Sequence, residues 1–166
     1  MRKATLALSA VLGLCVLAQA AAAQTKPWQF GPEVSLATNN LGLGIGARAV
    51  WNGLGTVTKV TGLGAYAGFD YFFSPNVFSS IWELNINGTW DIPNVTGQFK
   101  PYVGAGINYA HYSIPLGILG YGASESGLNV LGGAHFSPTP KLNLFGEARI
   151  ELRTASAIDF TVGIVF

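Results

Sequence analysis

The stretch "NLFGEARIEL", residues 143–152, alternates between two kinds of side chain. One face is apolar or small and carries Leu144, Gly146, Ala148, Ile150 and Leu152. The other face carries Phe145 and a charged row, Glu147, Arg149 and Glu151. A period of two indicates a β-strand whose faces meet different environments. The charged face would point to water in a soluble protein, or form an acid–base set in an enzyme. Which environment it meets depends on the rest of the chain.

The N-terminal residues predict a cleavable signal peptide. Arg2 and Lys3 precede an apolar run that ends in Ala21-Ala22-Ala23, an A-x-A cleavage pattern. We assign residues 1–23 to a signal peptide for export through the Sec pathway, and residues 24–166 to one barrel domain. An uncleaved membrane anchor is the alternative interpretation of the same run.

The composition favours a membrane barrel. The chain is 49% hydrophobic with 22 glycines, but only 10% of its residues are charged, against about 25% in soluble domains. After residue 23 there is no apolar run of the roughly 20 residues that a spanning helix needs. A closed β-barrel is the other structure that satisfies its backbone in lipid. Without Arg2 and Lys3, nine basic residues become seven against eight acidic ones, which gives no basic footprint for nucleic acid.

Eight segments of period two lie between turn signals. We expect strands at 29–38, 42–52, 62–73, 80–90, 99–112, 127–136, 143–152 and 157–166. Aromatic residues near both ends of these segments predict two interfacial girdles. The predicted fold is all-β, an eight-stranded antiparallel up-and-down transmembrane barrel, polar inside and apolar outside. No helix is expected, and the longest connection is predicted at about 113–125.

The polar faces of these strands predict a filled interior. An eight-stranded barrel is just wide enough for side chains to fill, and buried charges are normally paired. We therefore predict a polar network in the lumen, formed by Glu33, Arg48, Asp70, Glu83, Glu147, Arg149 and Glu151. Glycines on the same faces would leave room for the rings of Tyr66, Phe72, Tyr102 and Phe145. A catalytic set among the charged residues would need a substrate pocket, which a filled barrel lacks.

Two segments and the last strand carry a resemblance to a known family. With "KPYVGAGINYA" at 100–110 and "GLNVLGGAHFSPTPKLNLFGEARIEL" at 127–152, the chain resembles the OmpA transmembrane domain, OmpX and OmpW-like group of small outer-membrane barrels. The resemblance implies a monomer in a Gram-negative-type outer membrane, in contact with its lipids and without a cofactor. It also implies a signal read by the barrel-assembly machinery, formed by Phe160, Val162, Ile164 and Phe166. This group includes structural barrels, adhesins, minor channels and lipid-modifying enzymes, so the resemblance does not fix the activity.

An enzymatic alternative rests on His111, Ser113 and Glu125, whose types and spacing resemble the outer-membrane lipid A deacylase family. A nucleophilic serine needs a base and a carboxylate within hydrogen-bond reach. In that family Asn follows the serine, whereas Ile114 follows here, and the motif comes one hairpin too early in the chain. We therefore predict no catalytic residues. A metal site is not expected either, because His111 and His135 are the only histidines and the one cysteine leaves with the signal peptide.

Three functions remain open at this point. The favoured one is a non-enzymatic outer-membrane barrel with a mostly filled lumen, which supports membrane integrity or contacts a surface partner. The apolar connection 113–125 is the candidate contact, and equally a candidate cover for the barrel mouth. The second is a narrow channel or a barrel for small apolar ligands, because the inner faces are rich in glycine. The third is the deacylase-like enzyme.

Overall fold

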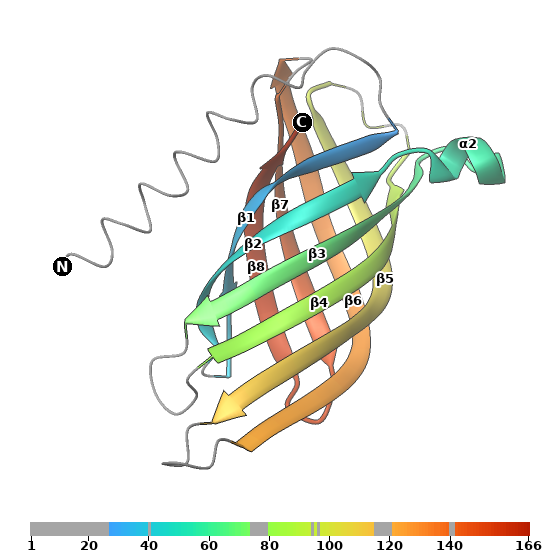
Figure 1. Ribbon diagram of the computed structural model, residues 1–166. Coiled ribbons are helices and arrows are strands. Elements are labelled where there is room, and N and C mark those ends of the chain that lie inside the picture. Colours follow the sequence, from blue (N-terminus) through green and yellow to red (C-terminus); the bar gives the residue numbers. More distant parts are fainter. Residues whose placement is uncertain are drawn as a thin grey trace.

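The strands follow one another around a closed barrel, in which each pairs antiparallel with its sequence neighbours and β8 returns to β1 (Figure 1). The computed structural model describes residues 27–39, 41–73, 80–93, 95, 97–114, 121–139 and 142–166. Its strands are β1 (Trp28–Ala37), β2 (Gly42–Trp51), β3 (Leu63–Phe73), β4 (Ser80–Asp91), β5 (Phe99–Ile114), β6 (Tyr121–Thr139), β7 (Leu142–Leu152) and β8 (Ala157–Val165). The predicted fold class is confirmed. The predicted signal peptide lies outside the described residues.

Seven strands begin and end within two residues of the predicted bounds, and β6 is the exception. It starts six residues before the expected position, and Ser113 and Ile114 still belong to β5. The predicted connection 113–125 is therefore wrong in its described part, which continues the β5–β6 hairpin. The reason is that "YGASES" at 121–126 has no contrast between its two faces, so hydrophobic alternation does not reveal it as a strand.

One helix was not expected. The connection from β2 to β3 contains α2 (Leu54–Thr58), a single helical turn. Lys59 follows it with φ 60°, in the left-handed region. A helix of this length is too short to show a period of 3.6 residues, and Asn52-Gly53 before it has the composition of a simple turn. Among the described residues, no helix is long and apolar enough to cross a membrane.

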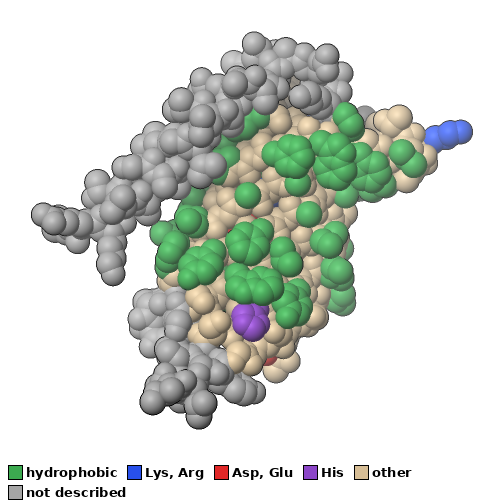
Figure 2. All heavy atoms as spheres, in the orientation of Figure 1, with side chains coloured by type: hydrophobic (Ala, Val, Ile, Leu, Met, Phe, Trp, Pro, Cys, Tyr) green, Lys and Arg blue, Asp and Glu red, His purple; other side chains and the backbone are tan. Residues whose placement is uncertain are grey.

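The outer wall of the barrel is apolar. Its exposed side chains include Phe30 (60% exposed) on β1, Ile86 (58%) on β4 and Val162 (62%) on β8. Figure 2 shows hydrophobic side chains distributed over the visible wall. This is the pattern predicted from the alternation, with the apolar face outside.

Aromatic rings gather at both ends of the wall. We call the end where β1 starts and β8 ends the terminal end, and the opposite end the distal end. At the terminal end, Trp28 stacks on Trp51 with ring centroids 5.8 Å apart. At the distal end, the ring centroid of Trp82 lies 6.3 Å from that of Phe69 and 5.5 Å from that of Tyr109. Two such belts are typical of barrels that span a bilayer.

Candidate functional site: the barrel interior

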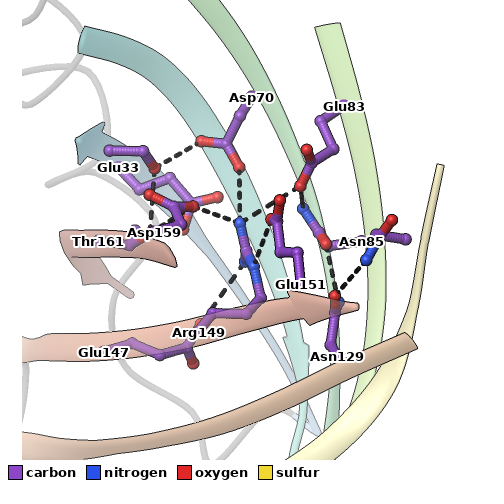
Figure 3. Close-up of polar contacts among 12 residues, drawn as sticks. Glu33, Asp70, Glu83, Asn85, Asn129, Glu147, Arg149, Glu151, Asp159 and Thr161 are labelled. Atoms are coloured by element: carbon purple, nitrogen blue, oxygen red, sulfur yellow. Dashed lines mark hydrogen bonds and ion pairs between the residues drawn. The ribbon is translucent and has the colours of Figure 1, made fainter. Parts of the chain in front are cut away.

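Arg149 of β7 lies at the centre of a buried charged cluster (Figure 3). The two-residue period of β7 turns it inward, and Asp159 lies directly opposite it on β8. Its guanidinium forms ion pairs with five carboxylates: Glu151 at 3.1 Å, Glu83 at 3.5 Å, Glu147 at 3.6 Å, Asp70 at 3.8 Å, and Asp159. One cation thus ties together four strands, β3, β4, β7 and β8.

Arg48 of β2 forms the second centre. Its Nε donates to Glu33 at 2.7 Å, and its two terminal nitrogens donate to the two oxygens of Glu147 at 3.1 and 3.2 Å. The guanidinium also lies between two rings, 3.9 Å from the centroid of Tyr66 and 4.0 Å from that of Phe145. A paired guanidinium between two aromatic faces is held by charge-assisted hydrogen bonds and cation–π attraction together.

Glu147 joins the two centres. Besides its contacts with both arginines, it accepts hydrogen bonds from the hydroxyls of Tyr66 at 2.5 Å and Tyr102 at 2.8 Å. The structure thus brings together all seven residues of the predicted network, and each is at most 5% exposed.

Two further residues, Asp159 and Arg153, join these seven in the cluster. Asp159 has the same parity as the inward residues of its strand, so alternation alone was sufficient to include it. Arg153 follows the end of β7, where strand parity no longer applies, and it pairs with Glu83 at 2.7 Å and Glu151 at 2.8 Å. Its position depends on the turn between β7 and β8, which the sequence pattern does not define.

Amide side chains extend the polar core. Asn129 donates to Asn85 at 2.9 Å and Asn87 at 3.0 Å, and accepts from Asn108 at 2.5 Å. Asn85 in turn donates to Glu83 at 2.8 Å, so the amides connect directly to the charged cluster. All of these side chains are buried, which matches the rule that buried polar groups are hydrogen-bonded.

Apolar layers lie at both ends of the polar core. The distal layer is formed by Ala37, Leu41, Phe72, Ile81, Ala110, Tyr112 and Ala157. The terminal layer is formed by Val50, Tyr66, Tyr102, Leu131, Phe145 and Val165. Beyond the terminal layer, a polar mouth of about 550 Å³ opens, with Asp91, Lys100 and His135 among its lining residues.

Glycines make room for the rings of both layers. A Cβ at Gly44 would lie 2.8 Å from the ring of Phe72, and one at Gly163 would lie 2.5 Å from the ring of Phe145. The space beside these two glycines is therefore occupied by aromatic rings, whereas the space beside Gly46 and Gly106 is occupied by polar side chains.

The interior charges are unequal in number. Three guanidiniums, those of Arg48, Arg149 and Arg153, face six carboxylates. Each guanidinium consequently pairs with at least two carboxylates, so the number of arginines limits the pairing in the cluster. In the part of the chain that the structure describes, no group of three or more His, Cys, Asp or Glu residues is arranged to hold a metal ion.

The residues of the enzymatic alternative do not form a triad. The register places Glu125 opposite Ala110, on the inward face, where its carboxylate accepts from the backbone N–H of Ala155 at 3.3 Å. His111 has the opposite orientation and stacks on the outer ring of Trp82. Its Nδ1 lies 2.8 Å from Ser124 Oγ, not from Ser113 or Glu125. The two-residue period of the strands separates the base from the carboxylate.

The four residues of the predicted assembly signal lie along the closing strand. Phe160 and Val162 are exposed on the outer wall at 53% and 62%. Beyond the regular register of β8 with β1, Phe166 exchanges two backbone hydrogen bonds with Phe30, at 3.1 and 3.3 Å. This segment therefore closes the barrel, while its part in assembly stays a prediction.

Comparisons with known proteins identify the fold. No protein-family model matches the sequence, and no curated protein matches it. The structure is similar to Neisserial surface protein A, with TM-score 0.62 and 17% identity over 83% of this chain and 94% of that one. It is similar to the N-terminal β-barrel domain of Pseudomonas aeruginosa OprF, with TM-score 0.61 and 10% identity over 83% and 97% of the two chains. The attachment invasion locus protein Ail of Yersinia pestis follows, with TM-score 0.58 and 10% identity over 83% and 94%.

The chain has the fold of the small eight-stranded outer-membrane β-barrels. At these sequence identities the likeness concerns the fold, and the activity has to be argued from the residues of this chain.

Few residues separate the strands that adjoin at the distal end. The strand bounds leave four residues between β1 and β2 and between β7 and β8, and six between β3 and β4 and between β5 and β6, whereas eleven separate β2 from β3 at the terminal end. Outer-membrane barrels usually have the reverse distribution, with long loops on the outer side. The longest distal feature here is the β5–β6 hairpin itself (Figure 1).

Proposed function

We propose that this protein is a monomeric outer-membrane barrel that supports membrane integrity and does not conduct solutes. In this proposal the chain is exported through the Sec pathway, inserted by the barrel-assembly machinery, and oriented with its terminal end toward the periplasm. One observation supports it above all: the charged core is buried, mutually paired, and bounded by an apolar layer at each end.

The filled interior favours this function over a narrow channel. An ion passing through would have to separate buried pairs such as Arg149–Glu151, and breaking a buried pair typically costs about 3–5 kcal/mol. A barrel for small apolar ligands is disfavoured for a different reason. The glycine-lined space is occupied by aromatic rings and polar side chains, and the mouth at the terminal end is lined by polar groups.

Planar-bilayer recording tests the proposal. The purified barrel is expected to insert without discrete conductance steps at neutral pH, while a 16-stranded porin in the same bilayer provides the positive control. Folding before insertion is checked by the faster gel migration of the unheated protein. Reproducible channel openings from correctly folded protein would contradict the sealed interior and support the channel alternative.

A second candidate function, contact with a surface partner, is favoured by the β5–β6 hairpin. β6 pairs with β7 only from Leu128 onward, so residues 121–127 pair with β5 on one side and have no strand partner on the other among the described residues. Free strand edges accept an additional strand from a partner. The attachment invasion locus protein of Yersinia pestis has a similar fold.

Cysteine labelling in intact cells tests this candidate, since the mature chain contains no cysteine. Ser124→Cys in the hairpin is expected to react with a membrane-impermeant maleimide. Thr56→Cys, in α2 at the terminal end, is the matched control and should react only after the outer membrane is permeabilised. Labelling of Thr56→Cys alone in intact cells would place the hairpin on the periplasmic side and exclude surface contact.

A further inference from the structure

Four side chains from three neighbouring strands meet on the outer wall at the distal end. Trp82 of β4 lies opposite His111 of β5, and His111 lies opposite Ser124 of β6. The rings of Trp82 and His111 stack with centroids 5.4 Å apart, and the ring centroid of Tyr109 lies 5.5 Å from that of Trp82. We call these residues the distal histidine cluster. It is separate from the buried network, which lies inside the barrel.

The cluster contains a hydrogen-bond chain that ends on His111. The hydroxyl of Tyr109 donates to Ser124 Oγ at 2.9 Å, and Ser124 Oγ lies 2.8 Å from His111 Nδ1. A serine hydroxyl has one proton, so the oxygen that accepts from Tyr109 is free to donate to Nδ1. A neutral imidazole that accepts at Nδ1 carries its proton on Nε2. In the tautomer in which Ser124 donates to Nδ1, His111 therefore has an N–H donor at Nε2 that Ser124 does not use.

The surroundings of His111 keep this donor accessible. Gly122 lies beside the ring, where a Cβ would be 3.1 Å from Cε1 and 3.4 Å from Nε2, so a larger residue would crowd the imidazole edge. No hydrogen-bond acceptor for Nε2 is found among the described side chains and backbone groups. The ring is thus fixed on one face by Trp82 and at Nδ1 by Ser124, with Nε2 open.

The level of the cluster on the outer wall indicates which chemical groups of a membrane can reach it. Trp82, Tyr109 and Phe69 form the distal aromatic belt, and such belts lie at the level of the lipid headgroups. In Figure 2 the green side chains of the visible wall give way toward the distal end to tan atoms, which belong to the backbone and to side chains of other types. At headgroup level the strong acceptors are phosphate oxygens, to which hydrogen bonds are charge-assisted and stronger than bonds to neutral groups. The described residues at the distal end provide no outward lysine or arginine that would compete for such a phosphate.

We propose that His111, oriented by Ser124 and flanked by Trp82 and Tyr109, binds the phosphate of a lipid headgroup in the outer leaflet through Nε2–H. The lipid's acyl chains would lie along the apolar wall below the belt, so the contact fixes the depth of the barrel in the membrane. This site rests on the proposed membrane location, but not on the sealed interior.

Nitrogen NMR of the two histidines tests the site. The folded protein, ¹⁵N-labelled at histidine, is studied in phosphate-free maltoside micelles. Before any addition, His111 is expected to show the Nε2–H tautomer. Titration with a short-chain phosphatidic acid should shift the His111 Nε2 signal saturably and leave His135, which stacks on Tyr102 inside the barrel, unchanged. A diacylglycerol of the same chain length lacks the phosphate and should produce no saturable shift.

Titration with inorganic phosphate tests whether the site binds the phosphate of a lipid or a free phosphate ion. At the same concentration it is expected to give no saturable shift, because it lacks the acyl chains that the apolar wall holds. An equal response to inorganic phosphate would overturn the lipid assignment and indicate a free-anion site. No saturable shift with phosphatidic acid, or a parallel shift of His135, would overturn the site altogether.

Ser124→Ala tests the positioning role of Ser124. The variant is expected to show mixed imidazole tautomers and to bind phosphatidic acid several-fold more weakly. Ser126→Ala, the next outward position on β6, should behave as the unmodified protein. Unchanged tautomer and affinity in Ser124→Ala would overturn the hydrogen-bond chain. Each comparison uses protein whose gel migration shows a folded barrel, so loss of the site is distinguished from failure of the membrane-barrel proposal.

Discussion

At the scale of single residues, Arg149 is the side chain on which the interior most depends. Five carboxylates converge on its guanidinium, and it is 1% exposed. Replacing it by methionine, Arg149→Met, would leave these carboxylates facing one another without their shared cation. We expect a loss of about 3–5 kcal/mol in the free energy of unfolding, as for other broken buried pairs. Reversible urea unfolding in detergent, followed by gel migration, measures this loss.

Two variants serve as controls for Arg149→Met. Asp159→Asn removes one of six carboxylates and keeps an acceptor oxygen, so its cost should be on the order of 1 kcal/mol. Lys59→Met changes an exposed cation after α2 and should stay within about 0.5 kcal/mol of the unmodified protein. If Asp159→Asn costs as much as Arg149→Met, the guanidinium is not the limiting partner of the cluster.

At the scale of elements, the β5–β6 hairpin departs most from the rest of the barrel. Residues 121–127 have β5 as their only strand partner among the described residues, so backbone amides that point away from β5 lack a strand acceptor. We expect alternate amides in 121–127 to exchange hydrogen with solvent at least tenfold faster than those in 128–136. Exchange followed by NMR in micelles measures this contrast, because both stretches belong to one strand. Uniform protection along β6 would mean that the edge is covered and would remove the docking candidate.

At the scale of the whole molecule, an apolar wall surrounds a polar core that has an apolar layer at each end. Under the proposed function, such a barrel would add a rigid, non-leaking body to a membrane. A strain that lacks the protein is therefore expected to take up more of a large apolar dye, and expression of the unmodified chain should restore exclusion. Arg149→Met should restore it less well, because less folded barrel accumulates. Equal dye uptake with and without the protein would contradict the integrity function.

The alternation along residues 143–152 determined much of this architecture by itself. A period of two assigns every strand residue to a face, so the inward placement of Glu147, Arg149 and Glu151 follows once the chain is read as a barrel. The predicted export, the low charge and the eight alternating segments together favoured a membrane barrel over a soluble fold. Two local features were missed, because α2 is one turn long and the outer half of the β5–β6 hairpin lacks alternation.

Only the tertiary structure decided which side chains meet. Periodicity gives the face of a residue but not the register between strands, and pairs such as Arg48–Glu147 join positions 99 residues apart. The same limit applies on the outer wall, where strand register places Ser124 beside His111 and turns Glu125 inward. Partner choice in a barrel is fixed by register and strand order around the closed sheet, which are properties of the assembled backbone and not of any single strand.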